Sequence, residues 1–300
     1  MAEKKVYWHL PGFCYFRNLN MITIELMNKY PECFNDGYCV GSVYGTFPGA
    51  VWNGGRAVLG LTLKNDIEKI LKAYNALNIP VRFTWTNSLL EEKHVYDTYC
   101  NLIMRLADNG MNQVLVNTPV LENYLRENYP NFKYISSTTK RLKTLEEIRA
   151  ELDKDYFMVV LDYDLNHNEE VLKSLEPCAE RVEILVDEVC FPGCPRRKDH
   201  YADESRKQLE FEAAAPFECQ NKYKPSFEEC KKRPQFISDE QMKDYIDRGF
   251  VNFKIVGRGL PAQMVEESYL YYLVKPEKRE FIKSEMHKLA AAIAKARAAK

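Results

Sequence analysis

The chain has 300 residues, of which 46% are hydrophobic and 28% are charged, and its formal net charge at pH 7 is −1. This length is enough for one large domain or two small ones, each with a full core. The near-zero net charge excludes an overall basic field that would draw the chain to nucleic acid or to an anionic membrane.

The sequence predicts a cytoplasmic protein without a membrane partner. No apolar run approaches the roughly 18 residues of a membrane span, and the N-terminal residues MAEKKVYWHL hold no apolar core of signal-peptide length. In a reducing compartment, the nine cysteines are more often free thiols or metal ligands than disulfides.

Eight short apolar runs recur along the chain at intervals that leave room for helices. Most of them are continuous rather than alternating, which is typical of parallel strands covered on both faces. The predicted strands span residues 6–9, 39–44, 81–86, 113–117, 134–137, 157–162, 182–187 and 251–256.

Amphipathic stretches lie between these runs and predict helices. Thr144 with Glu147, and Ser238 with Gln241, fit capping boxes at two helix starts. One predicted helical face holds Ile67, Ile70, Leu71, Tyr74 and Leu77. Strands that alternate with helices predict an α/β fold of the (β/α)8 TIM-barrel type over residues 1–275, with a doubly wound open sheet as the main alternative. Residues 276–300 are rich in Ala and Lys and predict a C-terminal helix.

Two long segments interrupt the alternation, and both follow the carboxyl ends of strands, where barrel active sites are built. Residues 45–63 hold five glycines and a proline, which predicts a shaped loop that lies over the barrel mouth as a lid. Residues 191–234 form an insertion after the seventh strand, which holds three cysteines and begins just after a fourth.

Those four cysteines, Cys190, Cys194, Cys219 and Cys230, are the candidate metal ligands. Cys190 ends a buried strand, and Pro192-Gly193 forms a natural turn that returns Cys194 toward it. Four thiolates can hold a 4Fe–4S cluster or a structural zinc ion, and the spacing does not separate the two. The alternative is that they are unrelated buried thiols.

Three polar residues at strand ends are candidates for orienting a substrate. Glu188 and Arg258 follow the seventh and eighth strands, where a buried charge is costly unless it has a partner. His9 ends the first strand and is expected to face the same cavity, although a lone histidine is more often structural. Many other strand-end residues, such as Ser137 and Asp162, could equally cap the following helices.

The second half of the chain resembles the collagenase-like peptidase family, U-32. The segments YISSTTKRL, FMVVLDYDLNHNEEVLKSL, VEILVDEVCFPGCPRRKDHY and FVNFKIVGRGLPAQMVEESYLYYL occur in the order seen in that family, between residues 113 and 273. The chain departs from the family signature because Asp187-Glu188-Val189-Cys190 stands where a His-Gly pair is usual. The resemblance therefore indicates a divergent branch.

The resemblance implies a (β/α)8 barrel and a 4Fe–4S cluster on Cys190, Cys194, Cys219 and Cys230. It favours an iron–sulfur enzyme of oxygen-independent hydroxylation or related redox chemistry, acting on a small or nucleotide-like substrate with an electron donor or partner protein. A peptidase, as the family name implies, is the first alternative, although no Ser–His–Asp, Cys–His or zinc-protease signature is recognisable. A non-catalytic binding or assembly protein with a structural zinc is the second.

Overall fold

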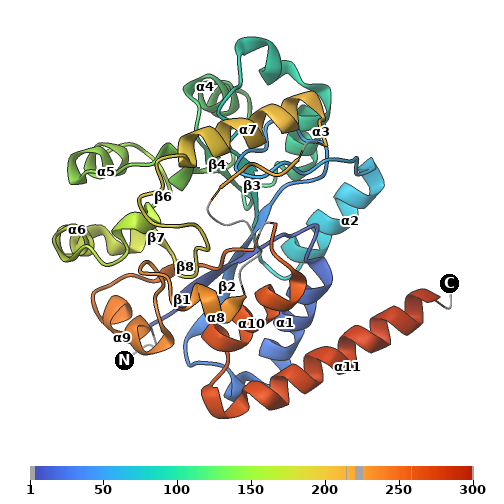
Figure 1. The fold of residues 1–300 in the computed structure, drawn as a ribbon. Coiled ribbons are helices and arrows are strands. Elements are labelled where there is room, and N and C mark those ends of the chain that lie inside the picture. Colours follow the sequence, from blue (N-terminus) through green and yellow to red (C-terminus); the bar gives the residue numbers. More distant parts are fainter. Residues whose placement is uncertain (1–3, 214, 220–225, 258, 299–300) are drawn as a thin grey trace.

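The computed structural model describes residues 4–213, 215–219, 226–257 and 259–298, and its centre is a closed barrel of parallel strands in the order β1 to β8 (Figure 1). The strands are β1 (Val6–Pro11), β2 (Tyr38–Gly45), β3 (Val81–Trp85), β4 (Gln113–Val116), β5 (Lys133–Ser136), β6 (Met158–Val160), β7 (Val182–Leu185) and β8 (Asn252–Lys254). The predicted TIM-type barrel is confirmed, and each of the eight predicted runs overlaps one of its strands.

Helices surround the barrel and cover the outer faces of the strands (Figure 1). They are α1 (Arg17–Lys29), α2 (Lys64–Asn75), α3 (Thr98–Ala107), α4 (Pro119–Asn128), α5 (Leu145–Leu152), α6 (Glu169–Leu175), α7 (Arg197–Glu210), α8 (Phe227–Cys230), α9 (Asp239–Asp247), α10 (Ala262–Leu273) and α11 (Arg279–Ala298). The insertion after β7 contributes α7 and α8. None of the described helices is long and apolar enough to cross a membrane.

Local sequence signals explain several helix boundaries. The Thr144 and Ser238 hydroxyls accept hydrogen bonds from the backbone N–H groups of Glu147 and Gln241, so both predicted capping boxes are present. The predicted apolar face of α2 is buried except for Leu77, which is exposed because the helix ends at Asn75. The Ala/Lys-rich C-terminal segment forms α11, which packs through Ile282 and Met286 before its end projects from the body of the molecule (Figure 1).

The barrel interior is arranged in layers because alternate residues of a strand face the same side. Along β3, Arg82 lies in a lower, charged layer, and Thr84 and Thr86 follow it toward the carboxyl end. In the same way Glu183 lies below Leu185 on β7. An apolar cluster fills the rest of the interior and consists of Leu115, Ile135, Met158, Val160, Tyr163 and Leu185.

The charged layer is centred on the Glu183 carboxylate, which is fully buried. Arg82 donates a short hydrogen bond to Glu183 Oε2, and the Lys254 Nζ lies 3.2 Å from Glu183 Oε1. His9 Nε2 lies 3.5 Å from the same carboxylate, and Arg82 Nε donates to Gln113 Oε1 at 2.9 Å. The neutral His9 of β1 and the charged side chains of β3, β7 and β8 are thus joined across the barrel.

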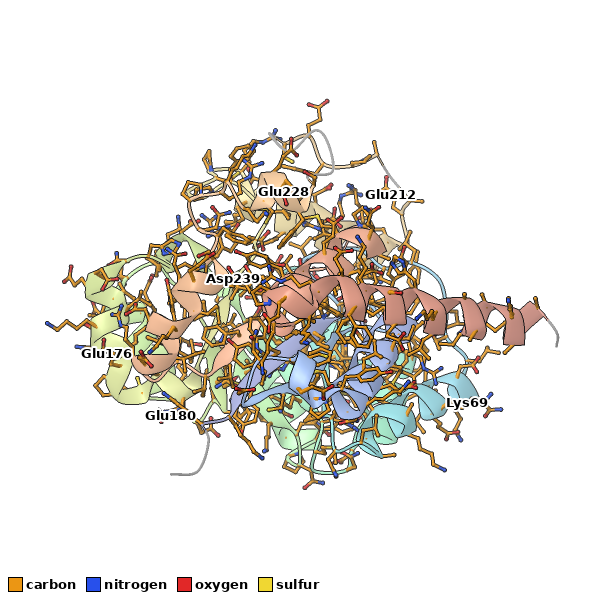
Figure 2. All side chains as sticks on the ribbon, turned by 90° about the horizontal axis from the view of Figure 1, so that it is seen from below. Lys69, Glu176, Glu180, Glu212, Glu228 and Asp239 are labelled. Carbon is orange, nitrogen blue, oxygen red and sulfur yellow. The ribbon has the colours of Figure 1, made fainter. Side chains whose placement is uncertain are left out.

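We expect the substitution Glu183→Gln to lower the free energy of unfolding by about 3–5 kcal/mol, because it leaves the buried charges of Arg82 and Lys254 without their counter-ion. Urea unfolding followed by circular dichroism measures the change. The matched control is Glu228→Gln, an acid on α8 that is 73% exposed and is labelled in the upper part of Figure 2; it should unfold like the wild type. A loss below about 1 kcal/mol for Glu183→Gln would contradict this account of the layer.

Candidate active site at the barrel mouth

A cavity of about 80 Å³ lies at the carboxyl end of the barrel, directly above the charged layer. Its walls combine strand ends with two loops and the first turns of α7. The lining residues are Tyr44, Gly55, Arg56, Thr84, Thr86, Leu115, Ser137, Thr138, Thr139, Leu185, Glu188, Val189, Cys190, Tyr201, Lys254 and Val256. Such a concave, polar site at this face is where the fold positions catalytic groups.

Among the described residues, the charged side chains that line this cavity are Glu188, Arg56 and Lys254. Glu188 Oε1 accepts a hydrogen bond from the Cys190 backbone N–H at 3.0 Å, which fixes the carboxylate above β7. Arg56 has Glu188, Glu204 and Tyr201 as electrostatic neighbours, and its Nη1 donates to the Gly55 carbonyl at 2.9 Å. Lys254 reaches the cavity from β8 while its Nζ lies 4.2 Å from the centre of the Tyr44 ring. The predicted position of Glu188 at the mouth is thus observed.

Asp187 and Glu188 are consecutive acids with different surroundings. Asp187 is buried, and its Oδ1 accepts a hydrogen bond from the Val256 backbone N–H at 2.7 Å. Burial, with a smaller contribution from Glu188, raises the pKa of Asp187 to about 7. Asp187 therefore supports the β7–β8 edge, whereas Glu188 faces the cavity.

His9 lies in the charged layer and is not among the described residues that line the mouth cavity. Its Nδ1 is 2.8 Å from Ser42 Oγ, and its Nε2 is 3.2 Å from Asn252 Oδ1. Burial and then the neighbouring Arg82 lower the pKa of His9 to about 3, so the ring is neutral at pH 7. The His9 ring is therefore enclosed in the charged layer below the cavity, and a role in orienting a substrate stays a prediction.

Arg258, the third predicted substrate-orienting residue, lies outside the described residues, and its role stays a prediction.

Three of the four predicted ligand cysteines line a second, smaller pocket of about 20 Å³ beside the mouth cavity. Its lining residues are Cys190, Phe191, Cys194, Arg196, Arg197, His200, Tyr201, Phe217 and Cys219. Burial, and then Glu188, raises the pKa of the Cys190 thiol to about 12, so the thiol is protonated at neutral pH. Cys190 and Tyr201 line both pockets and therefore connect them.

Cys230 is in a different place from the other three. It ends α8 inside the core, and its Sγ donates to the Asp187 carbonyl at 3.1 Å. Among the described residues, no group of three or more His, Cys, Asp or Glu side chains is arranged to hold a metal ion. Cys190, Cys194 and Cys219 thus share one pocket, whereas the buried Cys230 thiol is bonded to a backbone carbonyl just past β7, and a cluster held by all four stays a prediction.

Arg197, the first residue of α7, fixes the cysteine-bearing turn to the barrel. Its Nη2 donates to the carboxylates of Asp162 and Asp164 just past β6, and Asp164 in turn accepts from the Gly193 N–H at 3.0 Å. The guanidinium also stacks 4.3 Å from the Tyr163 ring. Asp162 and Asp164 thus act as anchors of the insertion rather than as groups in the mouth cavity.

The glycine-rich segment 45–63 lies at the carboxyl end of the barrel, as predicted for a lid. It supplies Gly55 and Arg56 to the cavity and is held by α7, whose Glu204 and Gln208 side chains accept hydrogen bonds from the backbone N–H groups of Ala57 and Val58 at 2.7 and 2.6 Å. Gly54 is required here because a Cβ atom would lie 2.2 Å from the Thr86 backbone.

The sequence interpretation missed Lys254, Arg197 and Tyr201 as contributors to these two pockets. For Lys254 there was a signal: a lysine in the middle of the mostly apolar eighth run is unusual for a buried parallel strand. Arg197 and Tyr201 fall in a basic, polar stretch that is also typical of a solvated helix, so the pattern alone could not single them out.

Comparisons with known proteins agree with the family resemblance. No family model matches the chain. Over 240 residues, 77% of this chain and 71% of the relative, the chain is 25% identical to the uncharacterized protease MJ1657 of Methanocaldococcus jannaschii. The solved structure of the U32 peptidase Mk0906 superposes with a TM-score of 0.52 at 17% identity, covering 87% of this chain and 96% of that one, which shows the shared fold. The chain is thus similar in sequence to an uncharacterized protease and shares its fold with a U32 peptidase, in line with the resemblance seen in its second half.

The lowered pKa of His9 predicts a pH dependence of stability. The unfolded chain binds a proton on this ring near pH 6.5 and the folded chain only near pH 3, so the free energy of unfolding falls as the pH falls between these values, by at most about 1.4 kcal/mol per pH unit. Urea unfolding at pH 7, 6 and 5 should show a steeper loss for the wild type than for His9→Gln.

The difference in pH dependence between the wild type and His9→Gln reports the contribution of His9 between pH 7 and pH 5. Asp187, whose pKa is raised to about 7, acts in the opposite direction but equally in both proteins. Parallel pH dependences would contradict the assignment of a neutral, enclosed His9.

Proposed function

We propose that the chain is an enzyme of the U-32 type that hydrolyses a peptide bond of a small substrate in the barrel-mouth cavity. The observation that carries this proposal is the Glu188 carboxylate, held by the Cys190 N–H in a polar cavity at the catalytic face of the barrel with the Arg56 guanidinium as its neighbour. The names of the two similar proteins, a protease and a peptidase, support the choice of hydrolysis.

In this mechanism Glu188 acts as the general base. It takes a proton from a water molecule, whose oxygen attacks the carbonyl carbon of the peptide bond. Arg56 stabilises the negative charge that develops on the carbonyl oxygen, a contribution that is typically worth ~10²–10³ in rate. When the C–N bond breaks, the protonated Glu188 returns its proton to the leaving amine, so that water is consumed and the carboxylate is regenerated.

The test is hydrolysis of a library of short peptides and of casein, with product detection by mass spectrometry. We expect the wild type to cleave short peptides and Glu188→Gln to be slower by at least about 10²-fold, since a general base contributes that much or more. The control Glu228→Gln, on the same insertion but fully outside the cavity, should retain the wild-type rate. Equal rates for the wild type and Glu188→Gln would overturn the role of Glu188.

Iron–sulfur chemistry, which the family resemblance implies, is the second candidate. One observation favours it: Cys190, Cys194 and Cys219 line a common pocket with Arg196 and Arg197, whose charges suit anionic thiolates. Thiolates are the ligands that a 4Fe–4S cluster or a structural zinc ion takes, but the three thiols are not arranged as a metal site among the described residues, so the turn would have to rearrange and Cys230 would have to leave the Asp187 carbonyl. A cluster would supply one-electron transfer next to the mouth cavity. An oxygen-independent hydroxylase of the cytoplasm would need such transfer, with a separate electron donor. Zinc would instead give a structural site in a binding or assembly protein.

Purification without oxygen, followed by iron, sulfide and zinc analysis, separates these possibilities. If the pocket holds a cluster, the protein is brown with equal iron and sulfide, and Cys190→Ser, Cys194→Ser and Cys219→Ser each lose the metal, while Cys100→Ser, a core thiol distant from the pocket in sequence, keeps it. A colourless protein with stoichiometric zinc supports the structural alternative. A protein that binds neither metal, or a Cys190→Ser variant with full metal content, contradicts the metal site.

A further inference from the structure

From the geometry of the mouth cavity we infer that Lys254, at its floor, binds the carboxylate of a small organic acid, which in a peptide is the C-terminal carboxylate. The inference rests on the proposed function only in taking this cavity as the substrate site. It assigns a ligand-binding role to Lys254, a cavity residue that the hydrolytic mechanism does not use.

The first support is the charge balance of the barrel interior. The charged layer contains two cations, Arg82 and Lys254, but one carboxylate, Glu183, and His9 is neutral. Above the layer, the Arg56 guanidinium has two carboxylates, Glu188 and Glu204, as neighbours, so no positive charge is left over there. Within the layer itself, the described side chains carry one more positive than negative charge, and a single carboxylate bound at Lys254 would neutralise it.

The position of Lys254 adds a second support. Lys254 is 5% exposed, and it is the cation shared by the charged layer and the mouth cavity. Its contact with Glu183 fixes the ammonium group at 3.2 Å from Oε1, and the Tyr44 ring packs against it. A ligand whose carboxylate enters first from the open end would thus meet a pre-positioned ammonium group at the bottom of the cavity.

A hydroxyl group on the wall is available for the same ligand. Thr86 lines the cavity and is 3% exposed, and its Oγ1 has no hydrogen-bond partner among the described residues. A buried hydroxyl without a partner is unfavourable unless a ligand or water satisfies it. It can donate to a carboxylate oxygen or accept from the adjacent N–H of a peptide.

The size of the cavity favours a carboxylate over larger groups. A water molecule requires about 10–15 Å³ of such volume, so 80 Å³ holds only a handful of water-sized groups. A carboxylate with a short stem fits, while an internal segment of a folded protein does not. The inference therefore predicts an exopeptidase or small-acid specificity, with the reacting bond near Glu188 and Arg56 at the upper part of the cavity.

The experiment is isothermal titration calorimetry with N-acetylglycine as the probe. N-acetylglycinamide serves as the uncharged control ligand and inorganic phosphate as the competing anion. We expect N-acetylglycine to bind at least tenfold more tightly than the amide and than phosphate, with an affinity that falls as salt is added. Lys254→Met should reduce the affinity at least tenfold, Lys254→Arg should restore part of it, and Thr86→Val should cause a smaller loss.

Two controls keep the outcomes separable. Lys243→Met removes an exposed lysine of α9 and should leave binding unchanged, and thermal unfolding of each variant detects a purely structural effect of Lys254. Glu188→Gln should bind the probe as well as or better than the wild type while losing hydrolysis. If Glu188→Gln binds N-acetylglycine but the wild type cleaves no peptide, the proposed hydrolysis is contradicted and the carboxylate site is retained.

Two results would overturn the carboxylate site itself. One is equal binding of the amide and the acid, or tighter binding of phosphate. The other is a folded Lys254→Met protein with unchanged affinity, which would leave Lys254 as only a partner of Glu183. If peptides with amidated C-termini were cleaved as well as free acids, hydrolysis would stand and the carboxylate site would fail.

Discussion

The buried carboxylate of Glu183 is the constraint on which the rest of the barrel depends. A single acid from β7 contacts Arg82 of β3, His9 of β1 and Lys254 of β8, so it joins strands that are not neighbours in the sheet. Charges inside a barrel are expensive unless they are paired with good geometry, and this pairing is possible only when the barrel is closed in the observed register. The interaction therefore links closure of the fold to the polar character of the site above it.

The site depends on a second set of ionic contacts at the end of β6. Because Arg197 binds Asp162 and Asp164, and Asp164 also accepts from Gly193, the turn that carries Cys190 and Cys194 is fixed to the strand ends rather than free in the loop. The same helix then holds the lid segment through Glu204 and Gln208. One helix thus sets the position of both Arg56 and Tyr201, which is how a long insertion and a distant loop come to share one cavity.

The features that the sequence predicted are those that depend on local patterns. Continuous apolar runs marked every strand, and the two capping boxes marked the starts of α5 and α9, because both signals are contained within a few neighbouring residues. The interior charges were not predicted, since the pairing of Arg82 with Glu183 joins positions 101 residues apart and follows from barrel closure. Cys230 illustrates the same limit: its spacing suits a metal ligand, but its thiol reaches a backbone carbonyl that only the tertiary fold brings near.

The protonation state of Cys190 distinguishes the two candidate chemistries of the mouth. Because burial raises the pKa of the Cys190 thiol to about 12, the thiol is neutral. Arg56 then faces the carboxylates of Glu188 and Glu204 without a neighbouring thiolate from Cys190, and a general base beside a stabilising guanidinium is a workable hydrolytic pair. A metal would require the thiolate, which adds a negative charge next to Glu188 and engages Arg56 as its counter-ion. Hydrolysis therefore requires Arg56 to be available to the substrate, whereas a metal site would engage Arg56 as the counter-ion of a thiolate. A metal in the cysteine pocket would thus change what the neighbouring cavity can bind and catalyse.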